Sequence, residues 1–571
     1  MEKRISVLFI TAVLLLCTAL CAAQDAPVTG LPKIDMTAWQ YEAEDNVYYQ
    51  LGISYCETPA DPDYENLAII IPAAYLKCSE NGGGTWTCSV DPAGKAGEFT
   101  AKTAPVVIPV ETPGYSAMAP LSEYSSRAAY TDEGFIYLHA GCRGRDQGAP
   151  AGVTDLKAAI RYFRYTADLL PGDPDAVFTF GMSGGGAQSA LLGATGDSSL
   201  YEPYLQAIGA VSGVSDAILG AMCWCPITNL DLANEAYEWM MGVTRSGLTD
   251  EEQAVSDNLA AAFATHLNEA GLRDPDGNIL TLEATGNDGI YQGGSYYDYM
   301  ITIIERSLNH FLRDTTFPYD ASASSRGGRG GGMRPDGDNP GGSRRDGELN
   351  FEDLDDITRS GSASGISLSG VYETPQDYID ALNANGEWVI YDARFNLAEI
   401  TGIADFVRAV KPASKNIGAF DQLDGGQGEN TLFGYGDGKG AHFDPILARI
   451  LSALGSQYAE AYAEDMTRTD ALGNTVDVRL SMYSPLYFLL ESEAGFETAS
   501  VAKYWRIRSG LFQGDCALST EMDLALALQN YETVAGVDFE TIWGAGHTKA
   551  ERSGESDANF IQWVKIIASG R

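Results

Sequence analysis

The feature that most constrains the fold of this chain is an apolar run that leads into a glycine-rich turn around a serine. Residues 177–182 are apolar and aromatic, and Ser183 follows inside the pattern Gly-Met-Ser-Gly-Gly. This order predicts a strand, a sharp turn and a helix, as in a nucleophile elbow that exposes the serine hydroxyl. The glycines are required because so tight a turn leaves no room for Cβ atoms. Ser183 is therefore a candidate nucleophile, and the N–H of Gly184 a candidate oxyanion donor. The alternative is a glycine-rich turn with a bystander serine.

The chain around the elbow alternates between strand and helix patterns. Residues 67–71, 106–110 and 135–140 are short apolar runs bounded by turn residues, which is typical of strands. Apolar side chains then recur every three or four residues from Val153 to Leu170, which predicts a helix packed on a sheet. Residues 207–211 are expected to form a further buried strand. This alternation predicts an α/β fold with a mostly parallel sheet and helices on both faces.

The rhythm changes between residues 226 and 480. Helical patterns cover 235–242, 251–268 and 296–312, and residues 322–350 are dense in Gly, Ser, Arg, Asp and Pro, which predicts a disordered loop. The α/β pattern then returns, with strands at 504–508 and 537–541, a helix around 520–528 and a last helix that contains residues 560–567. We therefore expect a hydrolase-like core in two parts, 24–225 (its first residues, 24–60, a lead segment) and 481–571, separated by an inserted cover domain, 226–480.

The first 23 residues have the pattern of a secretory signal peptide. Lys3 and Arg4 precede an apolar run at 7–20, and small residues at 21–23 suit cleavage before Gln24. A lipid anchor at Cys21 is the second interpretation, because Leu20 is large for such a site. No later run is long and apolar enough to span a bilayer. The prediction is a secreted or cell-surface protein.

The charge of the chain restricts its partners. The formal net charge is −41, and so acidic a surface repels nucleic acid and anionic membranes. Of the nine cysteines, seven follow residue 23, and Cys78 and Cys88 form the easiest local pair, on either side of a glycine-rich turn. Cys223 and Cys225 do not have zinc-site spacing and no histidine cluster accompanies them, so no metal site is predicted. The sequence does not indicate an oligomeric state.

A serine nucleophile needs a base, and the chain offers five histidines, at 139, 266, 310, 442 and 547. Two of them, His266 and His310, fall in helical patterns, His139 belongs to a strand, and His442 lies in the insertion. His547 remains, in a glycine-rich loop between the last strand and the last helix, which is where the base follows the acid in this type of fold.

The acid of the predicted triad is expected after the preceding strand. Asp515 is the carboxylate of that loop, since Glu521 and Asp523 belong to the next helix; a turn or helix-capping role for Asp515 is the alternative. A glycine loop that begins at Gly141 follows an earlier strand, and we expect the second oxyanion donor there; a plain turn is the alternative.

At this point the motifs resemble a known family. The resemblance is to bacterial tannases of the secreted and cytosolic subtype-B group, α/β-hydrolases related to feruloyl esterases. It rests on the elbow and on the segments 138–145 (LHAGCRGR), 155–159 (DLKAA), 170–173 (LPGD), 201–205 (YEPYL), 225–231 (CPITNLD), 420–421 (FD), 429–434 (ENTLFG), 482–485 (MYSP) and 506–508 (RIR).

The resemblance implies hydrolysis of small phenolic esters of the galloyl type through an acyl-enzyme, without a metal or organic cofactor. It implies Ser183 as nucleophile and His547 as base, with Gly184 and Gly141 as oxyanion donors. Lys415 and Glu429 resemble the cover-domain residues that contact the galloyl hydroxyls in the family.

One departure from the family concerns the acid. Tannases carry two aspartates in the loop after the strand, whereas this chain has Gln513 at the first position and retains Asp515. An amide cannot replace the charge, so either Asp515 acts as the acid and recognition of the galloyl group is altered, or the triad is impaired; we expect the first. Three alternatives stay open: a feruloyl or other hydroxycinnamoyl esterase, a serine peptidase of the same fold, and a phenolic-binding protein without catalysis.

Overall fold

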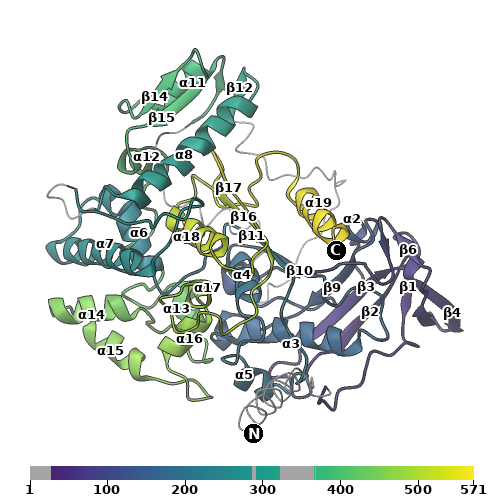
Figure 1. The fold of residues 1–571 in the computed structure, drawn as a ribbon. Helices are drawn as coiled ribbons and strands as arrows, with labels where there is room; N and C mark the ends of the chain where they lie inside the picture. The colour runs from purple at the N-terminus through teal and green to yellow at the C-terminus, as the bar shows by residue number, and fades with distance from the viewer. Residues whose placement is uncertain (1–26, 286–290, 322–365, 367) are drawn as a thin grey trace, which may run out of the picture.

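A nine-stranded sheet runs through the protein, in the order β1-β2-β3-β9-β8-β10-β11-β16-β17 (Figure 1). We describe a computed structural model that covers residues 27–285, 291–321, 366 and 368–571. The predicted signal peptide and the predicted loop 322–350 lie outside these residues. The strands are β1 (Gln40–Glu42), β2 (Val47–Ser54), β3 (Asn66–Pro72), β8 (Val106–Val110), β9 (Ile136–Ala140), β10 (Val177–Met182), β11 (Gly220–Trp224), β16 (Tyr504–Gly510) and β17 (Gly536–Ile542).

The sheet is mostly parallel. Strands β9, β8, β10, β11, β16 and β17 pair with one another in parallel, and β1 to β3 add antiparallel pairs at one edge. The strand β10, which precedes Ser183, lies between β8 and β11. The predicted α/β-hydrolase fold is confirmed.

The two faces of β10 are covered by different helices, because successive side chains of a strand point to opposite faces. Phe178 packs edge-on against Trp563 and Phe180 packs against Phe560, both in α19 (Ser556–Ser569), whereas the hydroxyl of Thr179 is hydrogen-bonded to Ser189 in α4 (Gly184–Ala194). Figure 1 shows α19 beside α2 (Ala128–Thr131), and α3 (Ala151–Thr166), α4 and α18 (Leu518–Gln529) away from them. The elbow strand is thus buried on both sides.

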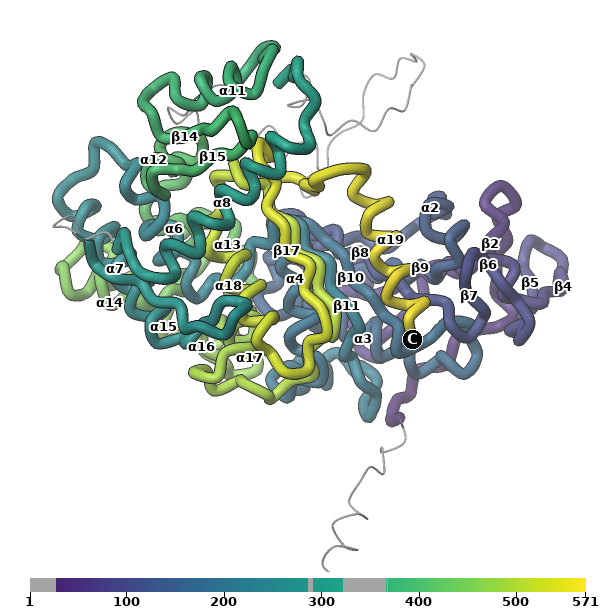
Figure 2. The backbone as a smooth tube through the Cα atoms, turned by 45° about the horizontal axis from the view of Figure 1, so that its top comes forward, coloured from purple at the N-terminus to yellow at the C-terminus, as the bar shows by residue number. Residues whose placement is uncertain are grey.

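The chain between β11 and β16 is mainly helical, and Figure 2 shows it gathered beside and above the parallel strands. Among the described residues it adds no strand to the large sheet. Its elements are α6 (Ala233–Met241), α7 (Asp250–Ala270), α8 (Ser295–Asp314), β12 (Tyr319–Asp320), β13 (Val371–Tyr372), α11 (Pro375–Leu382), β14 (Val389–Asp392), β15 (Leu397–Ile400), α12 (Ile403–Val410), α13 (Gly428–Leu432), α14 (Pro445–Leu454), α15 (Ala459–Thr467), α16 (Val476–Met482) and α17 (Pro485–Leu489).

One predicted strand, at residues 207–211, is absent from the structure. Residues 207–211 begin at the end of α5 (Glu202–Ala207) and do not form a strand of the large sheet. The strand that follows β10 in the chain is β11. The first residue of β11 is Gly220, where a Cβ would lie 2.8 Å from the ring of Phe178, so the position suits glycine and does not show the β-branched pattern that usually marks a strand. The expected lead segment 24–60 contributes β1 and β2 to the sheet.

The predicted cysteine pair is confirmed. Cys78 in β4 (Leu76–Gly82) forms a disulfide with Cys88 in β5 (Thr85–Val90), beside the small hairpin β6 (Lys95–Ala96) and β7 (Phe99–Thr100). The other described cysteines are buried and unpaired, at 56, 142, 223, 225 and 516. No helix in the described part of the chain is long and apolar enough to cross a membrane.

The packing of the elbow makes Gly185 a sensitive position. A Cβ at Gly185 would lie 2.0 Å from the carbonyl oxygen of Val110 in β8, so Gly185→Ala forces two backbone segments apart. We expect this change to lower the free energy of unfolding by about 3 kcal/mol, the upper range for overpacking. Chemical denaturation measures the difference. Gly536→Ala is the control, because its Cβ would meet only a ring atom of Tyr504 at 3.6 Å; equal stability of the two variants would contradict the prediction.

Candidate active site

Ser183 lies in a strained turn at the end of β10. Its backbone has φ 59° and ψ −124°, a conformation that favours glycine. The Ser183 N–H donates to the carbonyl of Trp224 at the end of β11 (3.0 Å), and the Ser183 carbonyl accepts from Ala187 in α4 (2.9 Å). The turn is therefore fixed from both sides, by the neighbouring strand and by the helix that follows. This is the geometry predicted for a nucleophile elbow.

Gly184, the predicted oxyanion donor, begins α4 and touches the loop that follows β8. A Cβ at Gly184 would lie 2.5 Å from the nitrogen of Tyr115 and 3.1 Å from the nitrogen of Gly114. The N–H of Tyr115 donates to Thr112 within the short helical turn Pro113–Tyr115. The loop after β8 thus packs directly against the residue that follows the serine, which is where the second oxyanion donor of a nucleophile elbow is expected.

Gly141, the second predicted donor, does not reach this place. Its N–H donates to the carbonyl of Asn66 (2.9 Å), and its carbonyl accepts from the hydroxyl of Tyr55 (2.8 Å). Gly141 follows β9, and β9 is separated from β10 by β8. We therefore correct the prediction: the loop beside Gly184 is the one that follows β8, and the Pro113-Gly114 dipeptide after the apolar run 106–110 is its sequence signal.

His547 follows β17, in a loop that is hydrogen-bonded to the loop after β16. Phe512 N–H donates to Ala545 (2.9 Å) and Leu511 N–H donates to the carbonyl of Ile542 (3.0 Å). Cys225, next to Trp224, contacts the carbonyl of Thr548 through its sulfur (3.2 Å). A series of contacts thus joins the ends of the neighbouring strands β10, β11, β16 and β17, from Ser183 at one end to Thr548, the residue after His547, at the other.

Gln513 is a hydrogen-bond partner of His547. Nδ1 of His547 lies 2.6 Å from Oε1 of Gln513 and 3.8 Å from the nearest carboxylate oxygen of Asp515. Asp515, the predicted acid, is thus close enough to act through its charge, while the direct contact is made by an amide. The sequence shows Gln513 as a departure from the family pattern but does not predict this contact with His547.

A buried carboxylate stands behind Gln513. Oε1 of Glu521, in α18, accepts from Nε2 of Gln513 (2.5 Å) and from the hydroxyl of Ser509 (2.8 Å), and the same amide nitrogen also lies 2.9 Å from the Ser509 oxygen. Burial raises the pKa of Glu521, and the positive charge of the buried Lys411 acts against that rise. Lys411 in turn donates to the backbone carbonyl of Gln513. Nothing in the sequence pattern predicts these contacts of Glu521, which belongs to the predicted helix around residues 520–528.

The other four histidines make different contacts. His139 is buried with Nε2 on the carbonyl of Ala119 (2.9 Å), His266 lies in α7, and His310 in α8 pairs with Glu540 (2.6 Å). His442 pairs with Asp465 through Nδ1 (2.9 Å), and its Nε2 lies 3.3 Å from the carbonyl of Leu423.

The two cover-region residues of the prediction lie on loops around these strand ends. Glu429 in α13 is buried. Burial raises the pKa of Tyr115, and the negative charge of Glu429 raises it further, so Glu429 lies near the loop that touches Gly184. Lys415 holds its ammonium group 3.9 Å from the ring centroid of Phe420, in a loop whose Ser414 hydroxyl donates to the carbonyl of Gly514. One residue is thus near the elbow and the other near the loop of Gln513.

Several motif residues have structural contacts instead. Arg143 forms a bidentate pair with the buried Asp155 (2.7 Å for the shortest contact), and the buried Lys157 pairs with Asp216 (2.7 Å). These pairs fix the loop after β9 and the start of α3. Their charges are neutralised within the fold, so these motif residues position the scaffold.

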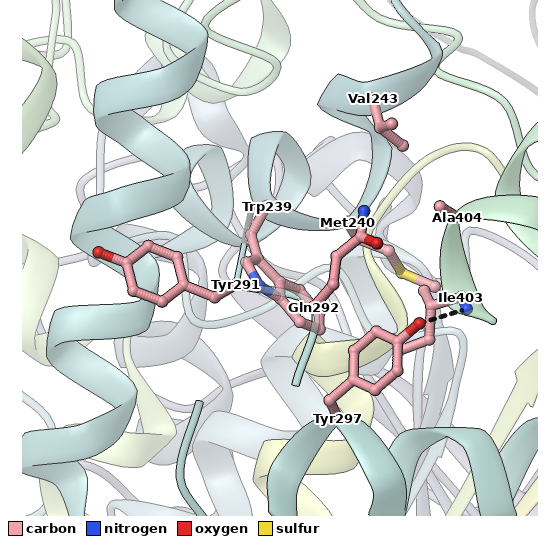
Figure 3. A pocket seen from close by; sticks show the side chains of 8 residues that line it. All are labelled: Trp239, Met240, Val243, Tyr291, Gln292, Tyr297, Ile403 and Ala404. Carbon is pink, nitrogen blue, oxygen red and sulfur yellow. Dashed lines mark hydrogen bonds between the residues drawn. The ribbon is translucent and has the colours of Figure 1, made fainter. Parts of the chain in front are cut away.

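A small hollow lies away from these residues (Figure 3). It is lined by Trp239, Met240, Val243, Tyr291, Gln292, Tyr297, Ile403 and Ala404, where the Tyr297 hydroxyl accepts from the Ile403 N–H (3.0 Å). None of the predicted site residues lines it. Within the described ranges, no group of three or more His, Cys, Asp or Glu side chains is arranged to hold a metal ion.

Comparison with known proteins supports the family resemblance. A family model described as BD-FAE matches residues 98–259. Tannin acyl hydrolase from Lactobacillus plantarum is 25% identical, with 97% of this chain and all of that chain covered and a TM-score of 0.63. Fusobacterium nucleatum tannase is 25% identical, with 95% and 98% covered and a TM-score of 0.65. A tannin acyl hydrolase in complex with ethyl gallate is 26% identical, with 97% and 100% covered and a TM-score of 0.62. No curated protein sequence matches.

The strained backbone of Ser183 predicts a stability difference between two substitutions. Ser183→Gly relieves the conformational strain, whereas Ser183→Ala keeps a Cβ at the same φ and ψ. We expect the glycine variant to be more stable than the alanine variant by about 1 kcal/mol. Relief of such backbone strain is worth about 1–3 kcal/mol, and part of this gain is lost because glycine makes the unfolded chain more flexible. Equilibrium denaturation of both variants measures this, and an alanine variant that is the more stable would refute it.

Proposed function

We propose that this tannase-like α/β-hydrolase is a secreted serine esterase that hydrolyses phenolic esters, galloyl esters first. The observation that carries the proposal is the position of three loops at the same edge of the parallel sheet: the Ser183 turn after β10, the Gln513–Asp515 loop after β16 and the His547 loop after β17, with β11 between β10 and β16. The similarity to tannases over almost the whole chain supports it.

The mechanism starts at His547. With a proton on Nδ1 that is donated to Oε1 of Gln513, Nε2 is the nitrogen that accepts the proton of the Ser183 hydroxyl. The Ser183 oxygen attacks the ester carbonyl, and the N–H groups of Gly184 and Gly114 stabilise the oxyanion. His547 then protonates the leaving alcohol, and an acyl-enzyme remains. Water activated by His547 releases the carboxylic acid and restores the serine.

Asp515 supplies the negative charge near the base. Its carboxylate lies 3.8 Å from Nδ1 of His547, and its side chain is 28% exposed. Two unit charges at such a distance attract by about 4 kcal/mol at an effective dielectric constant of 20, and by less where water has access. The charge stabilises the imidazolium that forms when Ser183 is deprotonated.

Lys415 and Glu429 are proposed to bind the phenolic hydroxyls of the acyl group. A site that pairs its own polar groups with those hydroxyls rejects rings that lack them, because the polar groups would remain unsatisfied. A feruloyl or hydroxycinnamoyl esterase is the alternative within this reaction class, and the BD-FAE match of the elbow region favours it. The Gln513 contact favours a second alternative, a protein that binds phenolic compounds without turnover.

Secretion is proposed on two grounds. The first is the signal-peptide pattern of residues 1–23, and the second is the Cys78–Cys88 disulfide, because disulfides persist mainly in oxidising compartments.

Hydrolysis of methyl gallate tests the function directly. We expect wild-type protein to be active, Ser183→Ala to lose about 10⁴-fold or more in kcat, and Asp515→Asn to lose about 10²-fold in kcat/KM because the imidazolium loses a nearby charge. A fluorophosphonate probe should label wild type and not Ser183→Ala. Methyl ferulate and an amide substrate, assayed in parallel, separate the esterase from its alternatives. Unchanged hydrolysis by Ser183→Ala would disprove the mechanism, and gallate binding without labelling or turnover would favour the binding protein.

Substitutions in the cover region test recognition of the acyl group. Lys415→Met and Glu429→Gln are expected to raise KM for methyl gallate about tenfold, with a smaller effect on methyl benzoate, which has no phenolic hydroxyl. Lys439→Met and Glu460→Gln are matched controls on exposed positions of the same region. Equal changes for both esters would remove these two residues from the binding site.

A further inference from the structure

The side-chain amide of Gln513 is held at both of its ends. Its nitrogen has two acceptors, Oε1 of Glu521 (2.5 Å) and the hydroxyl oxygen of Ser509 (2.9 Å), and its oxygen faces Nδ1 of His547 (2.6 Å). All four side chains are buried or nearly so, with Glu521 fully inaccessible to solvent. A side chain held in this way has one orientation available, and that orientation decides what His547 meets.

We propose that Gln513 is the positioning residue that keeps the proton of His547 on Nδ1, and that the buried carboxylate of Glu521 fixes the orientation of the Gln513 amide. The inference rests on the proposed function, in which Nε2 of His547 takes the proton of Ser183. It assigns to an amide and a remote carboxylate the orienting role that a directly bonded carboxylate has in the usual triad.

The orientation of the amide follows from the donors and acceptors around it. The Ser509 hydroxyl donates its proton to Glu521 (2.8 Å), so the Ser509 oxygen is left as an acceptor for the amide nitrogen. A flipped amide would place its oxygen against Oε1 of Glu521, where two acceptors would face each other. Glu521 therefore selects the orientation in which the Gln513 oxygen points to His547.

The tautomer of His547 follows from that orientation. An amide oxygen is an acceptor only, so the facing ring nitrogen must carry the proton. In a neutral imidazole the other nitrogen, Nε2, is then the acceptor, which is the form a general base requires. The flipped amide would offer a donor to Nδ1, move the proton to Nε2 and leave the base unable to accept from Ser183.

The surrounding contacts hold the backbone of Gln513 as firmly as its side chain. The ammonium group of the buried Lys411 donates to the Gln513 carbonyl, and Phe512, the preceding residue, bonds the chain before His547. The two tasks of a triad acid are therefore carried out by different residues. Gln513 and Glu521 orient the imidazole of His547, and Asp515, whose carboxylate lies 3.8 Å from Nδ1, supplies the negative charge that stabilises the imidazolium. Neither task requires a carboxylate at position 513.

The test compares three variants with wild type. Gln513→Leu removes all three hydrogen bonds of the amide. Glu521→Gln replaces the carboxylate by a group that can donate or accept, so that both orientations of Gln513 become available. The double variant Gln513→Glu with Glu521→Gln exchanges the amide and the carboxylate, and its new amide can donate to a carboxylate that accepts from His547. Gln529→Leu, on an exposed position at the end of α18, is the control.

The expected result is a split between kcat and KM on methyl gallate. We expect kcat to fall about 10³-fold for Gln513→Leu and about tenfold for Glu521→Gln, with KM within about threefold, because the wrong tautomer prevents proton transfer and leaves binding intact. The double variant should recover kcat to at least the wild-type value. Wild-type kcat for Gln513→Leu, or a double variant no better than Glu521→Gln alone, would overturn the proposal.

A second measurement does not depend on turnover. The ¹⁵N NMR spectrum of the five histidines, with His547→Gln for assignment, should show His547 protonated at Nδ1 in wild type and a mixture of tautomers in Glu521→Gln. A wild-type His547 protonated at Nε2 would overturn the inference even if a variant failed to fold. Failure of the proposed function has a different signature, namely no turnover and no fluorophosphonate labelling in a protein whose His547 is still protonated at Nδ1.

Discussion

The candidate active site depends on one backbone hydrogen bond, from the N–H of Ser183 to the carbonyl of Trp224. This bond ties the turn after β10 to the end of β11, and it holds Ser183 at a positive φ that only a surrounding structure can maintain. The residue after Trp224, Cys225, contacts the loop that carries His547. Parallel strands end at the same edge of a sheet, so side chains far apart along the chain are presented at one place.

In this site, the residue that orients the imidazole of His547 differs from the residues that carry negative charge near it. In a triad with a carboxylate, one residue both orients the imidazole and stabilises its charged form. Here an amide makes the contact with Nδ1, while the carboxylates of Asp515 and Glu521 stand beside it and behind it. An amide imposes a direction as strictly as a carboxylate, because each of its ends has a fixed hydrogen-bonding character. The departure from the family at position 513 is therefore compatible with an ordered base.

Much of the scaffold could be predicted from the sequence, because its signals are local. The apolar run before Ser183 and the helical periodicity from Val153 both correspond to elements of the structure. The errors concern residues whose roles depend on spatial neighbours. Gly220 begins a strand at a position where the ring of Phe178 leaves no room for a Cβ, and Gly141 is remote from the elbow because β8 lies between β9 and β10. The orientation of the Gln513 amide depends on Glu521, a partner that only the fold brings near.

The parallel pairing of β11 with β16 has a consequence for the order in which the protein is made. Trp224 and Tyr504 belong to neighbouring strands, yet the whole helical insertion is synthesised between them. A nascent chain that has emerged as far as the insertion already contains the elbow, and it contains neither the loop of Gln513 nor that of His547. The entropic free-energy cost of closing a loop grows only with the logarithm of the loop length, by about 0.6 kcal/mol for each doubling. A longer insertion would therefore destabilise the folded protein only slightly. During synthesis, however, Ser183 emerges long before His547, so the two residues can come together only when translation is nearly complete.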